Sequence, residues 1–134
     1  MNITCFDDLL SAARQQPEPQ RLLFVFVGAE LPEDATEEEK ARFESGEGGA
    51  LVPVVCVDKG LDELEDFEQL AEESRHTGKE WVMVFAAGMS GRAGIAPSSD
   101  EAIQPLNMMV EAIRLGHIGQ FLAFDREGDV VAFC

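Results

Sequence analysis

Three uninterrupted apolar runs constrain the fold of this 134-residue chain more than any other feature. They read RLLFVFVGA at 21–29, ALVPVVCVD at 50–58 and WVMVFAA at 81–87, and they are rich in residues that favour strands. A strand that is apolar along its length, without alternation, is covered on both faces. The runs therefore predict strands of a central sheet with a further layer on each side.

Amphipathic segments supply the helices for those layers. An apolar stripe predicts one helix at about 5–15, where Thr4 and Asp7 resemble a capping box. A longer stripe predicts a second helix over 61–76, and Gly78 is suited to the left-handed residue that follows such a helix.

Two prolines restrict the elements that contain them. Pro53 cannot donate to a ladder, so we expect it at a sheet edge, a bulge or the start of a strand. Pro105 would clash inside a helix with the carbonyl four residues earlier. We therefore expect the third main helix to begin at Pro105, and 98–103 to form a separate turn or short helix. The apolar face predicted for the third main helix comprises Ile103, Leu106, Val110 and Ile113.

The order of these elements indicates an α/β or α+β fold, as one layered domain over residues 1–134. We expect a mixed sheet of about four or five strands. Residues 28–49 form an acidic connection with a short helix that starts near Thr36. A C-terminal β-hairpin is predicted from QFLAF and VVAF, with Gly128 in the left-handed position of its turn.

Charge excludes several kinds of partner. The chain has 26 acidic and 10 basic residues, a net charge of -16, and residues 28–48 and 62–80 each contain eight acids and two bases. Such a surface repels phosphate backbones and anionic lipids, so we predict no nucleic-acid partner and no membrane partner. A basic protein is the partner that this charge favours.

The sequence predicts neither a metal site nor a cofactor. Cys5, Cys56 and Cys134 show no C-x-x-C spacing, and the two histidines lie far apart. Cys56 lies within an apolar run, where we expect a buried and inert thiol. Acids stand where a signal peptide needs a basic start, and no apolar run reaches about 18 residues, so we expect a cytoplasmic protein.

The stretch VMVFAAGMSGRAGIAPSSDE at 82–101 is the strongest candidate for a binding site. Glycines 88, 91 and 94 surround Ser90 and Arg92 there, which suggests a phosphate cradle. The spacing matches neither common phosphate-binding motif, however, and acids begin the next helix. A mobile connection explains the glycines without any ligand.

A nucleophile turn is the other interpretation of that stretch. Gly88, Met89 and Ser90 begin the pattern G-x-S-x-G, but Arg92 replaces the last glycine. His117 would have to be the base and Asp100 the acid of a triad. His117 is explained equally well as a cation that complements the C-terminal end of a helix dipole.

Three stretches resemble a known family: FDDLLSAARQQPEPQRLLFVFVGAELP, GEGGALVPVVCVDK and FLAFDREGDVV. Over nearly its full length, the chain is similar to small proteobacterial proteins that often carry the label "ribonucleotide reductase subunit alpha". The resemblance assigns no functional residue. The chemistry in the label needs a radical-forming cysteine, a redox pair and a C-terminal cysteine pair, whereas this chain has three scattered cysteines and no tyrosine. We therefore predict no catalysis of ribonucleotide reduction.

These observations favour a non-enzymatic cytoplasmic module that binds a partner through its acidic faces, with no catalytic residue. A second hypothesis is a small-molecule binder or small enzyme, with the ligand on Gly88, Ser90, Gly91, Arg92, Gly94 and His117. An accessory protein of ribonucleotide reduction and a protein that self-associates are two further hypotheses.

Overall fold

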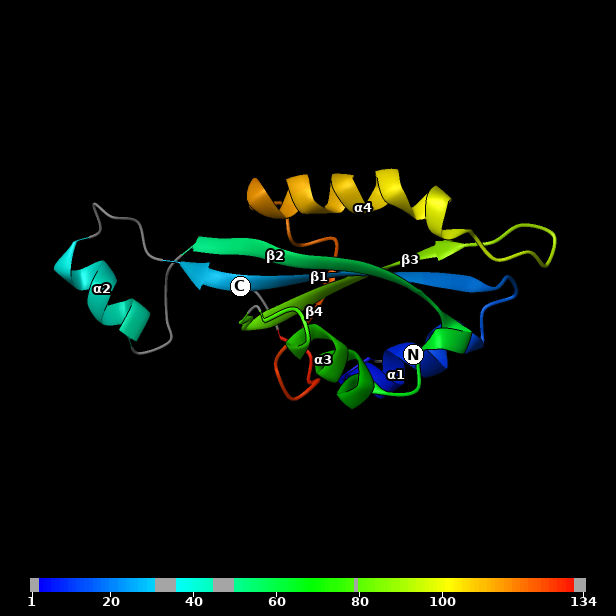
Figure 1. Cartoon of the computed structure of the whole chain (residues 1–134), viewed down its shortest axis with the longest axis horizontal. Helices are drawn as coiled ribbons and strands as arrows, with labels where there is room; N and C mark the ends of the chain where they lie inside the picture. The colour runs from blue at the N-terminus through cyan, green and yellow to red at the C-terminus, as the bar shows by residue number, and fades with distance from the viewer. Residues whose placement is uncertain (1–2, 31–35, 45–49, 79, 132–134) are drawn as a thin grey trace.

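Helices cover both faces of a four-stranded sheet (Figure 1). The computed structural model describes residues 3–30, 36–44, 50–78 and 80–131. The strands have the spatial order β2-β1-β3-β4, and all three neighbouring pairs are antiparallel. Their bounds are β1 Gln20–Glu30, β2 Ala50–Gly60, β3 Met83–Ser90 and β4 Leu122–Phe124.

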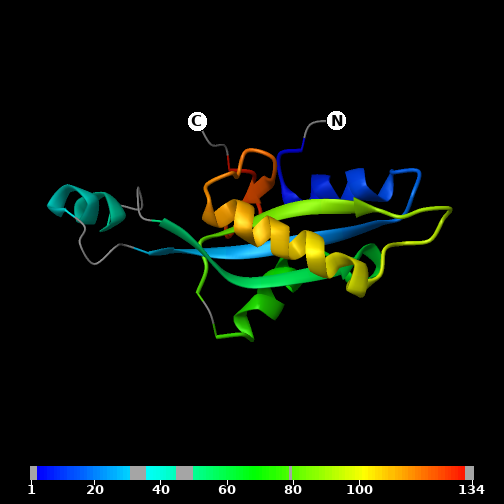
Figure 2. The same cartoon turned by 90° about the horizontal axis from the view of Figure 1, so that it is seen from above.

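The helices form a layer on each side of this sheet. The helices α1 and α3 lie on one face and α4 crosses the other, whereas α2 lies beyond the end of β1 and β2 (Figures 1 and 2). Their bounds are α1 Phe6–Arg14, α2 Glu37–Glu44, α3 Phe67–Arg75 and α4 Ser99–Arg114, with a short 3-10 helix η1 at Leu61–Glu63.

The predicted fold class is confirmed as a layered α+β domain. The expected mixed sheet is not found among the described strands, because every pairing there is antiparallel. The chain reverses its direction between β1 and β2. The connection that contains α3 then leads the chain to the other side of β1 from β2, where β3 also lies antiparallel to β1. No described helix is long and apolar enough to cross a membrane.

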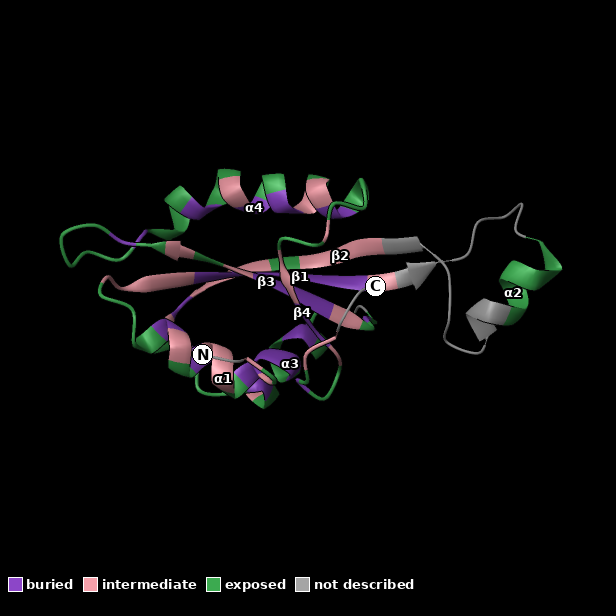
Figure 3. Ribbon diagram, turned by 180° about the vertical axis from the view of Figure 1, so that it is seen from behind, coloured by how far each residue is buried: buried purple, intermediate pink, exposed green. Residues whose placement is uncertain are grey.

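The strand β1 is the centre of both cores. Alternate side chains from Leu22 to Val27 pack on opposite faces, and all six are buried (Figure 3). Leu22, Phe24 and Phe26 face the α1 and α3 side, whereas Leu23, Val25 and Val27 face α4. The prediction of a strand covered on both faces is therefore confirmed for β1, whereas residues 52–59 of β2 are half-buried or exposed.

Aromatic rings fill the core under α1 and α3. The Phe6 ring lies 5.2 Å from that of Phe67 and 5.6 Å from that of Phe124, centroid to centroid, and both pairs have edge-on geometry. Trp81 packs edge-on against Phe26 at 4.9 Å. The indole nitrogen of Trp81 donates to the hydroxyl of Ser74 at 2.8 Å, so this buried polar group is satisfied.

The helix expected at about 5–15 is found as α1, but one other predicted helix start and one predicted cap are wrong. The segment 61–76 does not form one helix, because Leu64 is extended and buried and the carboxylate of Asp66 caps α3 at the amide of Gln69, at 2.9 Å. The expected box of Thr4 with Asp7 is also absent, since Thr4 donates to Asp8 instead. Gly78 has a φ of +74°, as its predicted place after the helix requires.

The predicted restriction on Pro53 is confirmed. The strand β2 lies at the edge of the sheet, and the register shifts where Val27 pairs with Pro53 and Phe26 with Val55. Val54 is therefore the extra residue of a bulge. Both features accommodate a residue that has no N–H to donate.

The predicted start of the third main helix at Pro105 is wrong. The helix α4 is continuous from Ser99, and its cap is a reciprocal box in which Ser98 Oγ accepts from the Glu101 amide at 3.2 Å and Glu101 Oε1 accepts from the Ser98 amide at 3.1 Å. Ala102 and Leu106 are buried on either side of the proline. The cap and this burial outweigh the bond that Pro105 cannot make.

The predicted short helix and the predicted hairpin are found in part. The amide of Glu39 donates to Thr36 Oγ1 at 3.2 Å at the start of α2, but its expected end at Gly46 lies outside the described residues. After β4, the Asp125 amide donates to the Asp129 carbonyl at 2.9 Å, and Gly128 has a φ of +86°. The hairpin is described only as far as residue 131.

An ion-pair cluster attaches the start of α4 to the sheet edge. Asp58 Oδ2 accepts from Arg21 Nε at 2.7 Å, from Arg21 Nη2 at 2.5 Å and from Ser99 Oγ at 2.8 Å. Burial raises the pKa of Asp58, but the bonds from Ser99 and Arg21 and the Arg21 charge outweigh it, so the pKa lies below its ordinary 3.8. The cluster therefore stabilises the fold with Asp58 ionised.

We expect Asp58→Asn to lower the free energy of unfolding by about 2 kcal/mol at neutral pH. Because the folded-state pKa is depressed, the contribution is complete above about pH 4 and is lost as pH falls through the lower folded-state value. Urea unfolding across this pH range measures the effect. The control is Asp100→Asn, which changes an exposed carboxylate on α4, next to Ser99. This substitution should lower the free energy of unfolding by only about 0.5 kcal/mol. Equal losses, or a pH-independent difference, would contradict this account.

We expect Pro105→Ala to raise the free energy of unfolding by about 1 kcal/mol. Alanine restores the amide that can donate to the carbonyl of residue 101, and Pro105 is only half-buried. Helix content by circular dichroism and urea unfolding measure the change. Gln104→Ala, at an exposed neighbouring position, should have little effect. A loss of stability in Pro105→Ala would show that the ring's packing matters more than the missing bond.

Candidate functional site

The glycine stretch after β3 forms a closed turn. Arg92 and Ile95 exchange two backbone hydrogen bonds, of 3.0 and 2.9 Å, and the central residues Ala93 and Gly94 have φ values of +52° and +78°. Two positive φ values identify a type I′ turn. The connection predicted after β3 therefore contains a hairpin turn.

The amides of this turn already have partners. The Gly91 amide donates to the Pro19 carbonyl at 2.8 Å, and the Gly94 amide donates to Glu18 Oε2 at 3.0 Å. A carboxylate thus takes the place that a bound phosphate would need. Arg92 is exposed and has no ion pair within the described part of the chain. Together with Ser90 and Gly91 it lines a hollow of about 430 Å³, where the carboxylate of Glu101 further disfavours an anion.

The structure does not bring Ser90 and His117 together. Ser90 ends β3, close to where α4 begins, whereas His117 follows the other end of α4, a helix whose 16 residues span roughly 24 Å (Figure 1). The His117 amide donates to the Ala112 carbonyl at 2.8 Å and Gly116 has a φ of +80°, as in a Schellman motif. His117 is therefore part of a helix end, and the proposed triad is not formed.

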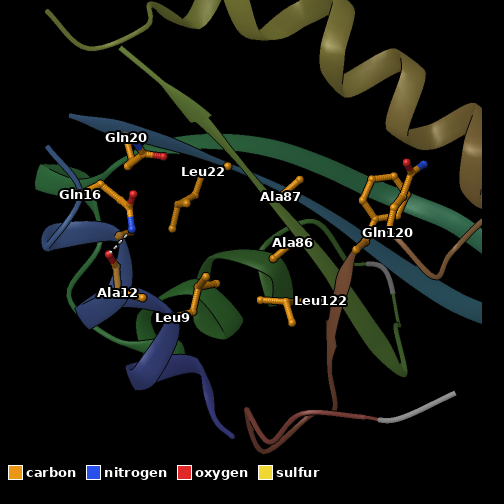
Figure 4. A pocket seen from close by; sticks show the side chains of 12 residues that line it. Leu9, Ala12, Gln16, Gln20, Leu22, Ala86, Ala87, Gln120 and Leu122 are labelled. Carbon is orange, nitrogen blue, oxygen red and sulfur yellow. Dashed lines mark hydrogen bonds between the residues drawn. The ribbon is translucent and has the colours of Figure 1, made fainter. Parts of the chain in front are cut away.

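Of the predicted site residues, only Gly88 lines a hollow that lies between α1 and the sheet. This hollow has a volume of about 430 Å³, within the range of small-molecule sites. It lies between α1 and one end of β1, β3 and β4 (Figure 4). We call it the glutamine cleft, after Gln16, Gln20 and Gln120. The residues that line it are Leu9, Ala12, Ala13, Gln16, Gln20, Leu22, Ala86, Ala87, Gly88, Gln120, Phe121 and Leu122.

Small side chains create this space. Ala12 and Ala13 line it from α1, and Ala86 and Gly88 line it from β3, whereas the side chain of Ala87 packs on the α4 side of the sheet. The backbone of Gly88 does not require glycine, because its φ is not positive and an added Cβ would meet only ordinary contacts, at 3.5 and 3.7 Å. The absence of a side chain at this position therefore keeps the cleft open rather than allowing a turn.

The polar groups of the cleft are amides, and none of its lining side chains is ionisable. Gln20 Nε2 donates to the Glu18 carbonyl at 3.1 Å and to Ser90 Oγ at 2.9 Å. Gln16 Nε2 donates to the Ala12 carbonyl at 3.2 Å, as Figure 4 shows. In a chain of net charge -16, an uncharged concave surface is unusual and marks this region as different from the rest of the exterior.

Three other hollows of similar volume have ionisable side chains in their linings. Hollows beside Trp81 are bordered by Arg126 and also by Glu80, so their charges oppose each other. Cys56 is exposed on the edge strand, contrary to the predicted burial, because one side of β2 has no neighbouring strand. Within the described ranges, no three potential ligands gather as a metal would need.

Comparison with protein-family models, with curated proteins and with solved structures finds no match to this chain.

Two glycines of the same stretch should respond differently to alanine. An added Cβ at Gly91 would overlap the Ile95 carbonyl and lie 3.0 Å from the Pro19 oxygen, so Gly91→Ala should cost about 2 kcal/mol or more. Gly88→Ala has room and should change stability by less than about 1 kcal/mol. Thermal and urea unfolding compare the pair. A tolerated Gly91→Ala would show that the turn can rearrange.

Proposed function

We propose that this protein is a non-catalytic binding protein whose glutamine cleft takes up an uncharged, partly apolar small molecule. The observation that carries the proposal is the lining of the cleft, which combines apolar side chains, three amides and no ionisable group. Small-molecule sites in proteins are mostly apolar hollows in which a few polar groups set orientation.

Charge restricts the class of ligand. An anion would approach against the field of 16 excess negative charges and find no cation in the lining. A cation would be attracted to the molecule, but no lining carboxylate would balance it once it lost water. A neutral molecule meets neither cost, and burial of its apolar part supplies the affinity.

The same lining supports binding rather than catalysis. General acid–base or nucleophilic chemistry needs a titratable group or an activated nucleophile within reach of the bound molecule. The hydroxyl of Ser90 accepts a hydrogen bond from the lining residue Gln20, and an amide is not a base that could activate it. The described residues therefore offer means to hold a ligand and no means to activate one.

A basic protein partner stays a prediction from charge. Glu37, Glu38 and Glu39 of α2 are exposed, and this helix lies beyond the layers of the domain (Figure 3). Such a helix has no apolar face among its described side chains to select a partner. The cytoplasmic location and the accessory role in ribonucleotide reduction also stay predictions.

Filling the cleft should abolish binding. We expect indole and cyclohexanecarboxamide, two neutral probes, to shift the amide NMR signals of Ala86, Gly88 and Leu122. Gly88→Val places a branched side chain where an added Cβ has ordinary contacts, so the fold should persist while affinity falls about tenfold or more. Asn107→Leu adds an apolar side chain on the exposed face of α4 and is the matched control. Absence of binding, or equal binding by all three proteins, would refute the proposal.

A further inference from the structure

The amide of Gln20 is held in one orientation by two hydrogen bonds. Its Nε2 donates to the backbone carbonyl of Glu18 at 3.1 Å and to Ser90 Oγ at 2.9 Å. A carbonyl oxygen can only accept, so the nitrogen of the side-chain amide must face Glu18. Both N–H groups of Gln20 are then used, and Oε1 is left as an acceptor.

That acceptor is directed into the glutamine cleft. Gln20 begins β1 and pairs with Ser90 on β3, which places its side chain beside Gly88. Oε1 lies 3.5 Å from the position of a Cβ added to Gly88. The oxygen therefore borders the space that the missing Gly88 side chain leaves open.

The other two glutamines are not fixed in this way. Gln16 Nε2 makes one bond, to the Ala12 carbonyl, so its second N–H and its oxygen are both available. Gln120 is exposed, and within the described part of the chain its side chain has no hydrogen bond. These two amides can turn to suit either a donor or an acceptor, whereas Gln20 can only accept.

From this geometry we propose that Gln20 determines the specificity of the cleft by selecting neutral ligands that carry an N–H or O–H donor next to their apolar part. The inference rests on the proposed function. A ligand with a donor satisfies Oε1, whereas an isostere without one covers that oxygen and leaves it unpaired. Sites built to pair with a ligand donor discriminate against analogues that lack it.

Matched pairs of probes test this inference. Indole carries an N–H where benzofuran carries an oxygen, and cyclohexanecarboxamide carries N–H groups that its methyl ester counterpart, methyl cyclohexanecarboxylate, lacks. We expect the donor member of each pair to bind the wild-type protein about tenfold more tightly, measured by titration of the amide NMR signals of Gly88 and Leu122. The side-chain amide of Gln20 should shift with the donor member only.

Gln20→Met keeps the length of the side chain and removes the acceptor. The two members of each probe pair should then bind with about equal affinity, because only the burial of their apolar part still contributes. Gln16→Met is the control and should keep the preference. If Gln20→Met does not fold, the wild-type ratio alone decides, because equal affinity within both pairs overturns the role of Gln20. Equal binding with shifts in the cleft would refute this inference and leave the proposed function intact. Binding by none of the four probes would overturn both.

Discussion

Burial of β1 on both faces is the constraint on which the rest of the structure depends. Residues 22–27 supply alternate side chains to two cores, and all six are buried. A charged or unpaired polar side chain at any of these positions would lack water and partners on either face. The strand can therefore carry polar chemistry only at its ends, and the helices take their places from the two apolar faces that it presents.

The N-terminal end of β1 shows how one strand serves two purposes. Arg21 forms an ion pair with Asp58, and the carboxylate of Asp58 also accepts a hydrogen bond from Ser99. This cluster attaches the start of α4 to the sheet edge. Gln20, the preceding residue, points to the opposite face and forms part of the glutamine cleft. Neighbouring residues of a strand face opposite sides, so the structural attachment and the proposed ligand site lie on opposite faces of the sheet at the same point of the chain.

The sequence predicted the main elements because their signals are local. Uninterrupted apolar runs identified β1, β2 and β3, and Pro53 indicated the edge or bulge that β2 shows. Helix starts were less predictable, since Asp66 and the box of Ser98 with Glu101 act through geometry that apolar spacing does not reveal. The continuity of α4 through Pro105 depends on burial of its inner face, which is decided by the sheet beneath it.

The candidate site likewise combines features that the sequence predicts with features that only the tertiary structure decides. The sequence by itself determined the strands, the layered class, the excess of acidic residues and the presence of glycines around Ser90. Only the tertiary structure decided what each glycine does: Gly94 serves a turn, Gly91 allows a close backbone approach, and Gly88 leaves room for a cleft. It also separated His117 from Ser90 and brought Gln16 and Gln120 to the two sides of one hollow. A hollow is bounded by segments that are distant in the chain, and no local pattern records how those segments meet.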